Sequence, residues 1–404
     1  MFYLLNNIYH NFVNSDPYSK ARNSLSELFF NRLEDDLNSS RDKNLYREVR
    51  LYPDCRINLC ANDYFQLRHD ARVIAGAKKA CENYGTGSGA SPLLSGFLPC
   101  HQSLLDALLT WKHKSHGMLF NSGFMANQAV LKHLPGKNDL VLADKLIHHS
   151  IAQALLQGSA RFKRYHHLDL EHLRELLDTH HKDYETIFVV TESVFSMDGD
   201  YPDLRKLVDL KKDYPFILIL DEAHGTGVFG KTGGGLAEAM QVQDKVDILI
   251  GTLGKSLASM GAYVLSESST VIDFLVNRAG EFIYSTFLSP AQVGSAEIAI
   301  KILQSAEEER RFLQKISRNF RAKLKNKEWE DLTHHSPIVP ILIGDPGKTL
   351  DLRNILLKKG IMVGAIRPPT VSPHTSRLRI SLHTGVNQET LDELGEILAP
   401  WINP

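Results

Sequence analysis

The sequence predicts an α/β protein built around a mostly parallel β-sheet with helices on both faces. Two observations support this fold class. Continuous runs of Val, Ile and Leu alternate with helical segments from about residue 139 to residue 265, as expected for parallel strands buried on both faces. Charged side chains follow several of these runs, and in open α/β sheets the functional groups lie beyond the carboxyl ends of the strands.

Length and composition narrow the class of protein further. The chain has 404 residues and a net charge of −1, which allows about two or three domains and shows no basic surface for nucleic acid. Four cysteines without CxxC spacing favour neither a disulfide scaffold nor a zinc site, and they fit a reducing cytoplasm. No apolar run approaches the length of about 20 residues that a membrane-spanning helix needs.

The first part of the chain carries weaker patterns. Residues 1–30 are interpreted as a loosely organised extension, residues 26–47 as a helix, and residues 57–67 as a short strand followed by a turn. Residues 84–96 form a glycine-dense loop. A dinucleotide-binding loop should follow a strand, but a predicted helix (residues 74–83) precedes this one, so a tight active-site loop is the better interpretation.

A phosphate site is predicted at residues 119–131, where a strand leads into an amphipathic helix. Ser122 and Gly123 stand at the predicted start of that helix, and the free N–H groups of a helix N-terminus bind phosphate well. An ordinary serine cap at the start of a helix is the alternative.

The predicted strands at residues 139–144, 186–192, 216–224 and 246–251 end near Asp144, Glu192, Asp221 and Lys255 respectively. A lysine just past a buried strand, among glycine and small residues, is well placed for a lowered ammonium pKa and a Schiff base. The pairs of adjacent histidines at 148–149, 166–167, 180–181 and 334–335 lack an HExxH pattern, so no metal site is expected.

A smaller C-terminal unit is predicted to follow. A long charged helix (residues 291–326) leads to a strand at 339–344 and a loop at 365–382. The expected organisation is an N-terminal extension with a helix (1–56), a large cofactor domain (57–288) and a small α+β domain (289–404). A lysine, a strand-end acid, a nearby histidine and a phosphate-binding helix start are together what pyridoxal phosphate requires.

The motifs NDY (62–64), GSGASPLLSG, NSGFMANQAV, TESVFSMDGD, DEAHGTGVFG, TLGKS and IYST together resemble the α-oxoamine synthase family of fold-type-I pyridoxal phosphate enzymes. The resemblance runs from about Leu33 to the C-terminus, and AIRPPTV favours the branch of biotin synthesis. It implies a large domain with a seven-stranded sheet. The sequence departs from the family pattern in Phe65 and Gln66, in residues 256–258 after the lysine, and in the first thirty residues.

The resemblance also implies roles for individual residues. Lys255 would bind the cofactor, Asp221 would hold its pyridine nitrogen, His224 its phenolic oxygen, and His148 would stack on the ring. The remaining residues around the cofactor would be Glu192 and Ser196 beside the ring, Ser122, Gly123, Phe124 and Thr252 at the phosphate, and Ser285 and Thr286 reaching it from the partner subunit of a homodimer. The substrate residues would be Asn62, Arg367, Thr370 and Arg379, with Arg47 near the acyl substrate.

The implied reaction is a decarboxylative condensation of L-alanine with a pimeloyl thioester of coenzyme A or acyl carrier protein. Glycine C-acetyltransferase, serine palmitoyltransferase and α-aminoketone signal synthase activities remain alternatives within the family. A non-catalytic scaffold of the same fold is the alternative from another class, and the presence of Lys255 with Asp221 and His224 argues against it.

Overall fold

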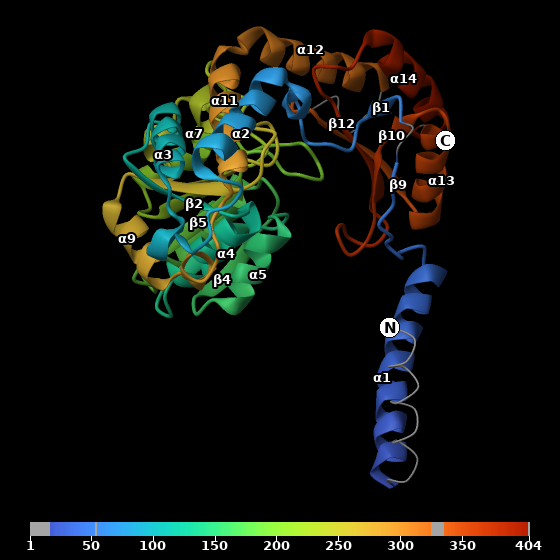
Figure 1. Cartoon of the computed structure of the whole chain (residues 1–404), viewed down its shortest axis with the longest axis horizontal. Coiled ribbons are helices and arrows are strands. Elements are labelled where there is room, and N and C mark those ends of the chain that lie inside the picture. Colours follow the sequence, from blue (N-terminus) through green and yellow to red (C-terminus); the bar gives the residue numbers. More distant parts are fainter. Residues whose placement is uncertain (1–16, 53–54, 325–334, 403–404) are drawn as a thin grey trace.

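The computed structural model describes residues 17–52, 55–324 and 335–402. It shows a large unit around a central sheet, a smaller unit formed mainly by the C-terminal part of the chain, and a helix, α1 (Pro17–Asp42), that extends away from both (Figure 1). The predicted fold class is confirmed. In the described residues, no helix combines the length and apolar character needed to cross a bilayer.

The central sheet has seven strands in the order β2-β8-β7-β6-β5-β3-β4. Strands β3 to β7 pair in parallel, and β8 runs antiparallel to both of its neighbours, β7 and β2. The bounds are β2 His116–Phe120, β3 Leu140–Asp144, β4 Arg161–Tyr165, β5 Ile187–Glu192, β6 Ile217–Asp221, β7 Ile248–Thr252 and β8 Ala262–Ser266. Every residue of β3, β5 and β8 is buried, as the continuous apolar runs require.

Helices connect and cover these strands. Their bounds are α2 Ala71–Tyr84, α3 Pro99–Lys112, α4 Gly123–His133, α5 His149–Gln157, α6 Leu170–His180, α7 Leu204–Asp209, α8 Leu236–Met240, α9 Ser269–Arg278, α10 Gly280–Ile283 and α11 Pro290–Ser305. Short 3-10 or π turns occur at η2 Leu67–His69, η3 Pro92–Gly96, η4 Leu210–Lys212 and η5 Gln243–Lys245. Helix α11 packs against α2 and α3, which ties the start of the predicted small domain to the large unit.

The smaller unit has an antiparallel sheet in the order β11-β12-β9 and a parallel pair of β1 with β10. Its elements are β1 Ile57–Asn58, α12 Glu307–Leu324, β9 Ile338–Gly344, α13 Pro346–Lys358, β10 Ile361–Met362, β11 Gly364–Ile366, β12 Ser376–Ser381 and α14 Gln388–Ile402. The chain therefore enters this unit at β1 before it builds the large one. The three-domain division stays a prediction.

Four elements differ from the sequence prediction. The first helix spans Pro17–Asp42 rather than residues 26–47, so residues 17–25 are helical and not part of a loosely organised extension. It ends at Asp42 because Asn44 takes a left-handed conformation and the amide of Leu45 donates back to the Ser40 carbonyl at 2.8 Å. The long charged helix is two helices, α11 and α12, separated at Ala306. The predicted loop 365–382 contains most of β11 and all of β12. Strand β4 was not predicted from the sequence, because its residues, RFKRY, are mostly polar and solvent-exposed.

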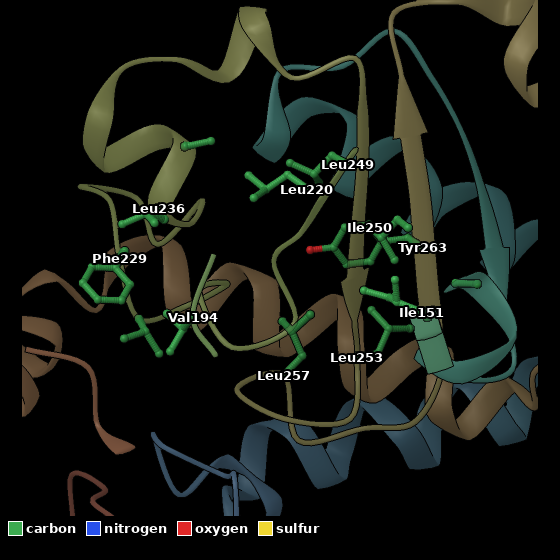
Figure 2. Close-up of a cluster of buried hydrophobic side chains, with 14 of the residues drawn as sticks. Ile151, Val194, Leu220, Phe229, Leu236, Leu249, Ile250, Leu253, Leu257 and Tyr263 are labelled. Carbon is green, nitrogen blue, oxygen red and sulfur yellow. The ribbon is translucent and has the colours of Figure 1, made fainter. Parts of the chain in front are cut away.

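The core holds the loop after β7 in place. Leu253 and Leu257 are fully buried on either side of Lys255, within a cluster that includes Leu220, Leu249 and Ile250 (Figure 2). The Leu253 amide also donates to the Gly261 carbonyl at 2.8 Å. Two buried anchors at positions two residues before and after Lys255 fix the direction in which this lysine leaves the backbone.

Candidate active site

A cavity of about 240 Å³ lies beyond the carboxyl ends of the central strands, between the large and the smaller unit. Residues of both units form its walls: Cys60, Asn62, His148, Ser196, Met197, His224, Lys255, Gly364, Ile366 and Arg379. Six of these residues, Asn62, His148, Ser196, His224, Lys255 and Arg379, are predicted site residues. The parallel sheet brings four of them together, His148, Ser196, His224 and Lys255, because the ends of β3, β5, β6 and β7 meet at one edge. Asn62 and Arg379 reach the cavity from the smaller unit.

Lys255 follows β7 and faces this cavity. In the described residues, its ammonium donates no hydrogen bond and forms no ion pair. Burial lowers the pKa of the Lys255 ammonium to about 8, although the charges of Asp221 and Glu192 oppose the shift. Near neutral pH about a tenth of Lys255 is therefore a neutral amine, which is the form that attacks carbonyl carbon and accepts protons.

Asp221, at the end of β6, is 6 % exposed and its carboxylate is held from two sides. The Ala223 amide donates to one oxygen at 2.8 Å, and the Asn127 amide group donates to the other at 2.9 Å. Each carboxylate oxygen keeps a further lone pair for another donor. Asp221 is thus a fixed acceptor for a cationic or N–H group.

Asn127, from helix α4, extends this network to His148. Its amide group also donates to Ser150 Oγ at 3.0 Å, and Ser150 Oγ lies 2.7 Å from His148 Nδ1. The Ser150 backbone amide donates to the same Nδ1 at 3.2 Å. Because Nδ1 accepts these bonds, the proton of neutral His148 sits on Nε2. Burial lowers the pKa of His148, so this tautomer is uncharged near neutral pH.

His224 lies on the loop after β6 and pairs with a buried tyrosine. Tyr64 Oη lies 2.7 Å from His224 Nδ1, and the Tyr64 side chain is fully buried. Burial lowers the pKa of His224 well below its usual value, and the nearby charges of Lys255 and Arg379 lower it further. His224 is therefore a neutral imidazole that offers its Nε2 edge to the cavity.

Arg379, on the central strand β12 of the smaller sheet, is oriented by three hydrogen bonds. Its Nη2 donates to Asn62 Oδ1 at 3.0 Å, its Nη1 to Ser381 Oγ at 2.8 Å, and its Nε to the Ser196 carbonyl. A guanidinium has five N–H donors, and the Tyr64 hydroxyl is a further partner of this one. A fixed guanidinium that lines the cavity is suited to bind a carboxylate there.

The predicted phosphate site is the N-terminus of helix α4. Ser122 caps the helix by accepting from the Met125 amide at 3.2 Å, so the predicted serine cap and the predicted phosphate site coincide. Thr252, at the end of β7, borders this helix start: a Cβ placed on Gly123 would lie 3.8 Å from Thr252 Cβ. The first amides of α4 and the Thr252 hydroxyl therefore lie side by side.

The structure places other predicted residues outside the cavity wall. Glu192 is buried behind it and accepts the His148 backbone amide, and Phe124 is 43 % exposed on the first turn of α4. Ser285 and Thr286 lie outside this chain's cavity, where the Thr286 carbonyl accepts from Asn121 at 2.7 Å. The glycine-dense loop 84–96 also lies outside it. This loop packs on residues 287–288 through Ser88 and Ala90.

The two other predicted arginines meet at a different place. Arg367 donates to the backbone carbonyls of Asn44 and Tyr46, and Arg47 donates to Thr370 Oγ1 at 2.8 Å. The structure therefore separates Arg367 from Arg379, which the sequence had assigned to the same side. Arg367 ties the segment after α1 to the loop after β11.

Sequence reasoning did not single out Asn127 or Tyr64 as site residues. Both carried a signal: Asn127, with Gln128, interrupts the otherwise apolar run of residues 124–131, and Tyr64 carries a hydroxyl inside the NDY motif. Buried polar groups of this kind require a hydrogen-bond partner. Among the residues that the structure describes, no group of three or more His, Cys, Asp or Glu side chains could hold a metal ion.

Comparison with known proteins shows the family to which the chain belongs. The aminotransferase class I and II family matches residues 56–398, so the chain belongs to this family of fold-type-I pyridoxal phosphate proteins. The residues present fit that cofactor: a lysine that faces the cavity, a buried carboxylate with free lone pairs, and a helix N-terminus beside a hydroxyl.

Curated relatives narrow the class of protein within this family. The chain is 38% identical over 370 residues to "8-amino-7-oxononanoate synthase" of Geobacter sulfurreducens, covering 88% of this chain and 94% of the relative. It is 40% identical to the protein of the same name from Anaeromyxobacter dehalogenans, covering 83% and 84%. The resemblance to the α-oxoamine synthases is thereby confirmed.

Solved structures with a similar fold include members of the same enzyme family. The "Sphingomonas wittichii Serine palmitoyltransferase" structure has a TM-score of 0.81 at 26% identity and covers 96% of this chain and 98% of its own. The 8-amino-7-oxononanoate synthase of Francisella tularensis has a TM-score of 0.73 at 29% identity, covering 85% and 97%. A high-resolution structure described as SPT with PLP has a TM-score of 0.81 and 26% identity and covers 96% and 98%.

Proposed function

We propose that this protein condenses L-alanine with a pimeloyl thioester to give 8-amino-7-oxononanoate, carbon dioxide and a free thiol. The observation that carries the proposal is one cavity in which Lys255, His148, His224 and Arg379 converge. Support also comes from curated relatives named 8-amino-7-oxononanoate synthase at up to 40% identity.

Pyridoxal phosphate, when bound, supplies the electron sink that stabilises a carbanion at the amino-acid α-carbon. Lys255 would hold the cofactor, Asp221 its pyridine nitrogen and His224 its phenolic oxygen, while neutral His148 would cover the ring. Ser122, Gly123, Phe124 and Thr252 would bind its phosphate, and Glu192 would hold His148 from behind through the His148 amide.

The chain's own groups account for the proton and orientation steps. The free amine of Lys255 takes the α-proton of alanine. Arg379, with Asn62, grips the alanine carboxylate and sets which bond at the α-carbon can break. The carbanion then attacks the thioester carbonyl, the thiolate leaves and takes a proton from solvent, and the carboxylate leaves as carbon dioxide. Lys255 returns the proton to the α-carbon.

Other residues are proposed to act at the acyl end. Arg47, Arg367 and Thr370 converge at the junction of residues 44–47 with the loop after β11. These three polar side chains are suited to bind the carrier or the distal carboxylate of the acyl chain. A cytoplasmic location fits four free cysteines in the described chain.

We further propose a homodimer whose subunits share active sites, with Ser285 and Thr286 reaching the partner's phosphate site. The exposure of large apolar side chains near these residues supports it: Tyr284 is 86 % exposed and Leu94 83 %. Exposed apolar groups of this size favour a protein–protein contact.

The test is a screen of L-alanine, glycine and L-serine against pimeloyl, acetyl and palmitoyl thioesters, following thiol release. Turnover with L-alanine and the pimeloyl thioester is expected. The second candidate is L-serine with a palmitoyl thioester, which the TM-score of 0.81 to a serine palmitoyltransferase favours. Preference for that pair would replace the proposal.

The role of Lys255 has its own test. Borohydride should fix pyridoxal phosphate to the Lys255 peptide of the wild type, and Lys255→Ala should abolish turnover while the protein stays folded. Arg164→Ala, on the edge strand β4, is the control and should keep full activity. Label on a different lysine would overturn the assignment.

A further inference from the structure

His167, one of the adjacent histidines that the proposed reaction does not use, lies between two carboxylates. Its Nδ1 is 2.8 Å from Asp144 Oδ1 and its Nε2 is 2.9 Å from Asp200 Oδ2. Asp144 is fully buried at the end of β3. Both ring nitrogens face acceptors, so both carry protons and the ring is an imidazolium. Burial opposes this charge, but the two carboxylates outweigh it and raise the pKa of His167 to about 10.

One of these carboxylates belongs to the loop 195–200. The loop is a tight turn in which the Phe195 amide donates to the Asp200 carbonyl at 2.9 Å and the Gly199 amide donates to the Phe195 carbonyl at 2.8 Å. The edge of the buried Phe195 ring meets the His167 ring, with centroids 4.4 Å apart at 90°. His167 therefore holds both ends of this loop against the central sheet.

The other side of the loop contacts the smaller unit at three points. The Ser196 carbonyl accepts from Arg379 Nε, Asp198 forms an ion pair with Arg377, and the Gly199 carbonyl accepts from Ser336 Oγ at 2.5 Å. Ser196 and Met197 of the same loop line the cavity. The direction of the Arg379 guanidinium thus depends on where this loop lies.

We propose that His167 is a positioning residue: clamped between Asp144 and Asp200, it fixes the loop 195–200 and thereby aims Arg379 at the amino-acid carboxylate. Without the imidazolium, Asp144 and Asp200 lose their shared cationic partner, and a buried carboxylate without one is costly. The loop then relaxes and Arg379 loses its fixed acceptor at Ser196. The inference rests on the proposed role of Arg379.

The experiment compares His167→Phe with His166→Phe. Phenylalanine keeps the ring but removes both hydrogen bonds. His166 is the matched control because its side chain is 67% exposed and its ring lies against His172, with centroids 4.1 Å apart at 41°, rather than against the loop. Two quantities are measured: hydrogen exchange of the amides in residues 195–200 without cofactor, and KM for L-alanine and for the pimeloyl thioester with cofactor.

In His167→Phe, exchange should rise in residues 195–200. The KM for L-alanine should rise about tenfold, the scale of one charged hydrogen bond. The KM for the thioester should stay within about twofold, because the loop aims the carboxylate-binding arginine. His166→Phe should change neither. Unchanged exchange, an equal rise in both KM values, or exchange raised across the whole chain would overturn the inference.

A second variant and a measurement without substrate test the same inference if His167→Phe does not fold or the wild type is inactive. If His167→Phe does not fold, Asp200→Asn keeps the shape of the loop residue, removes one of the two charges, and should give smaller changes in the same direction. If the wild type does not turn over L-alanine, the proposed function fails. The exchange experiment, which needs no substrate, still decides whether His167 holds the loop.

Discussion

Among the individual residues of the cavity, burial sets the chemistry. Lys255, His148 and His224 all have pKa values below their usual range, chiefly because burial disfavours their charged forms. The site thereby holds one amine close to its titration point and two neutral imidazoles. An amine that titrates near neutral pH can both accept and return a proton, as the proposed reaction requires.

The lowered pKa of Lys255 leads to a pH prediction. The neutral amine predominates above the pKa of about 8 and the inactive ammonium below it, so deuterium exchange at the α-carbon of L-alanine should rise with pH through a midpoint near 8 and then level off. The measurement is the exchange rate by NMR between pH 6 and pH 10. Lys255→Ala should show no such rise. A wild-type inflection at the usual lysine pKa would contradict the assigned base.

Arg379 leads to a second prediction for a single side chain. Arg379→Lys keeps the charge but loses the planar fork that holds a carboxylate with two bonds. L-alanine binding should weaken by about 1.5–3 kcal/mol, the contribution of one charged hydrogen bond. Titration with L-alanine by the visible absorbance of the bound cofactor measures this change.

The Arg379→Lys variant should bind the pimeloyl thioester almost as tightly as the wild type does, and side reactions of alanine should increase. Arg367→Lys is the matched control, since Arg367 lies outside the cavity and should leave alanine affinity unchanged. The reverse pattern, with thioester affinity lost in Arg379→Lys, would place Arg379 at the acyl end.

Between secondary-structure elements, the contact of helices α2 and α11 depends on glycine. A Cβ on Gly294 would lie 2.5 Å from the Gly76 carbonyl oxygen and 2.6 Å from Ala80 Cβ, and a Cβ on Gly76 would lie 2.8 Å from the Gly294 carbonyl oxygen. The rigid backbone of one helix therefore faces the glycine of the other. This contact holds α11, which leads the chain from the large unit to the smaller one.

Gly294→Ala should destabilise the protein by about 1–3 kcal/mol, because the added methyl group forces the two helices apart. The measurement is the melting temperature by circular dichroism. Gly280→Ala is the control, since its Cβ would meet only the Tyr284 ring at 3.5 Å, an ordinary contact. Equal melting temperatures for both variants would show that the helices separate without cost.

For the molecule as a whole, the central prediction is the shared active site of a homodimer. Lys255→Ala chains and Ser285→Ala/Thr286→Ala chains should each have reduced activity. Mixed dimers of the two should regain activity, because one of their two sites combines an intact lysine with the partner's intact Ser285 and Thr286. The measurement is thiol release after the two variants are unfolded together and refolded.

A mixture of two wild-type preparations, treated in the same way, gives the reference activity. Light scattering should give twice the mass of one chain. A monomer mass would remove the basis for shared sites. Dimers whose mixture shows no gain in activity would instead place Ser285 and Thr286 outside the partner's site.

Local sequence patterns were enough to predict the class of sheet and most of the groups at its edge. Apolar runs at residues 139–144 and 186–192 predicted β3 and β5 closely, because each strand buried on both faces needs apolar residues throughout. Asp221 and Lys255 were found for a related reason. Asp221 is the last residue of β6 and Lys255 comes shortly after the end of β7, so position along the chain already places both at the sheet edge.

The meeting of distant groups, in contrast, became visible only in the folded chain. Arg379 and Ser196 are 183 residues apart, and His224 and Tyr64 are 160 apart. Arg367 and Arg379 looked equivalent in the sequence, yet one lies outside the cavity and the other lines it. Local patterns report the neighbours of a residue along the chain. Contacts between separate elements depend instead on how those elements pack, and that information is spread over the whole core.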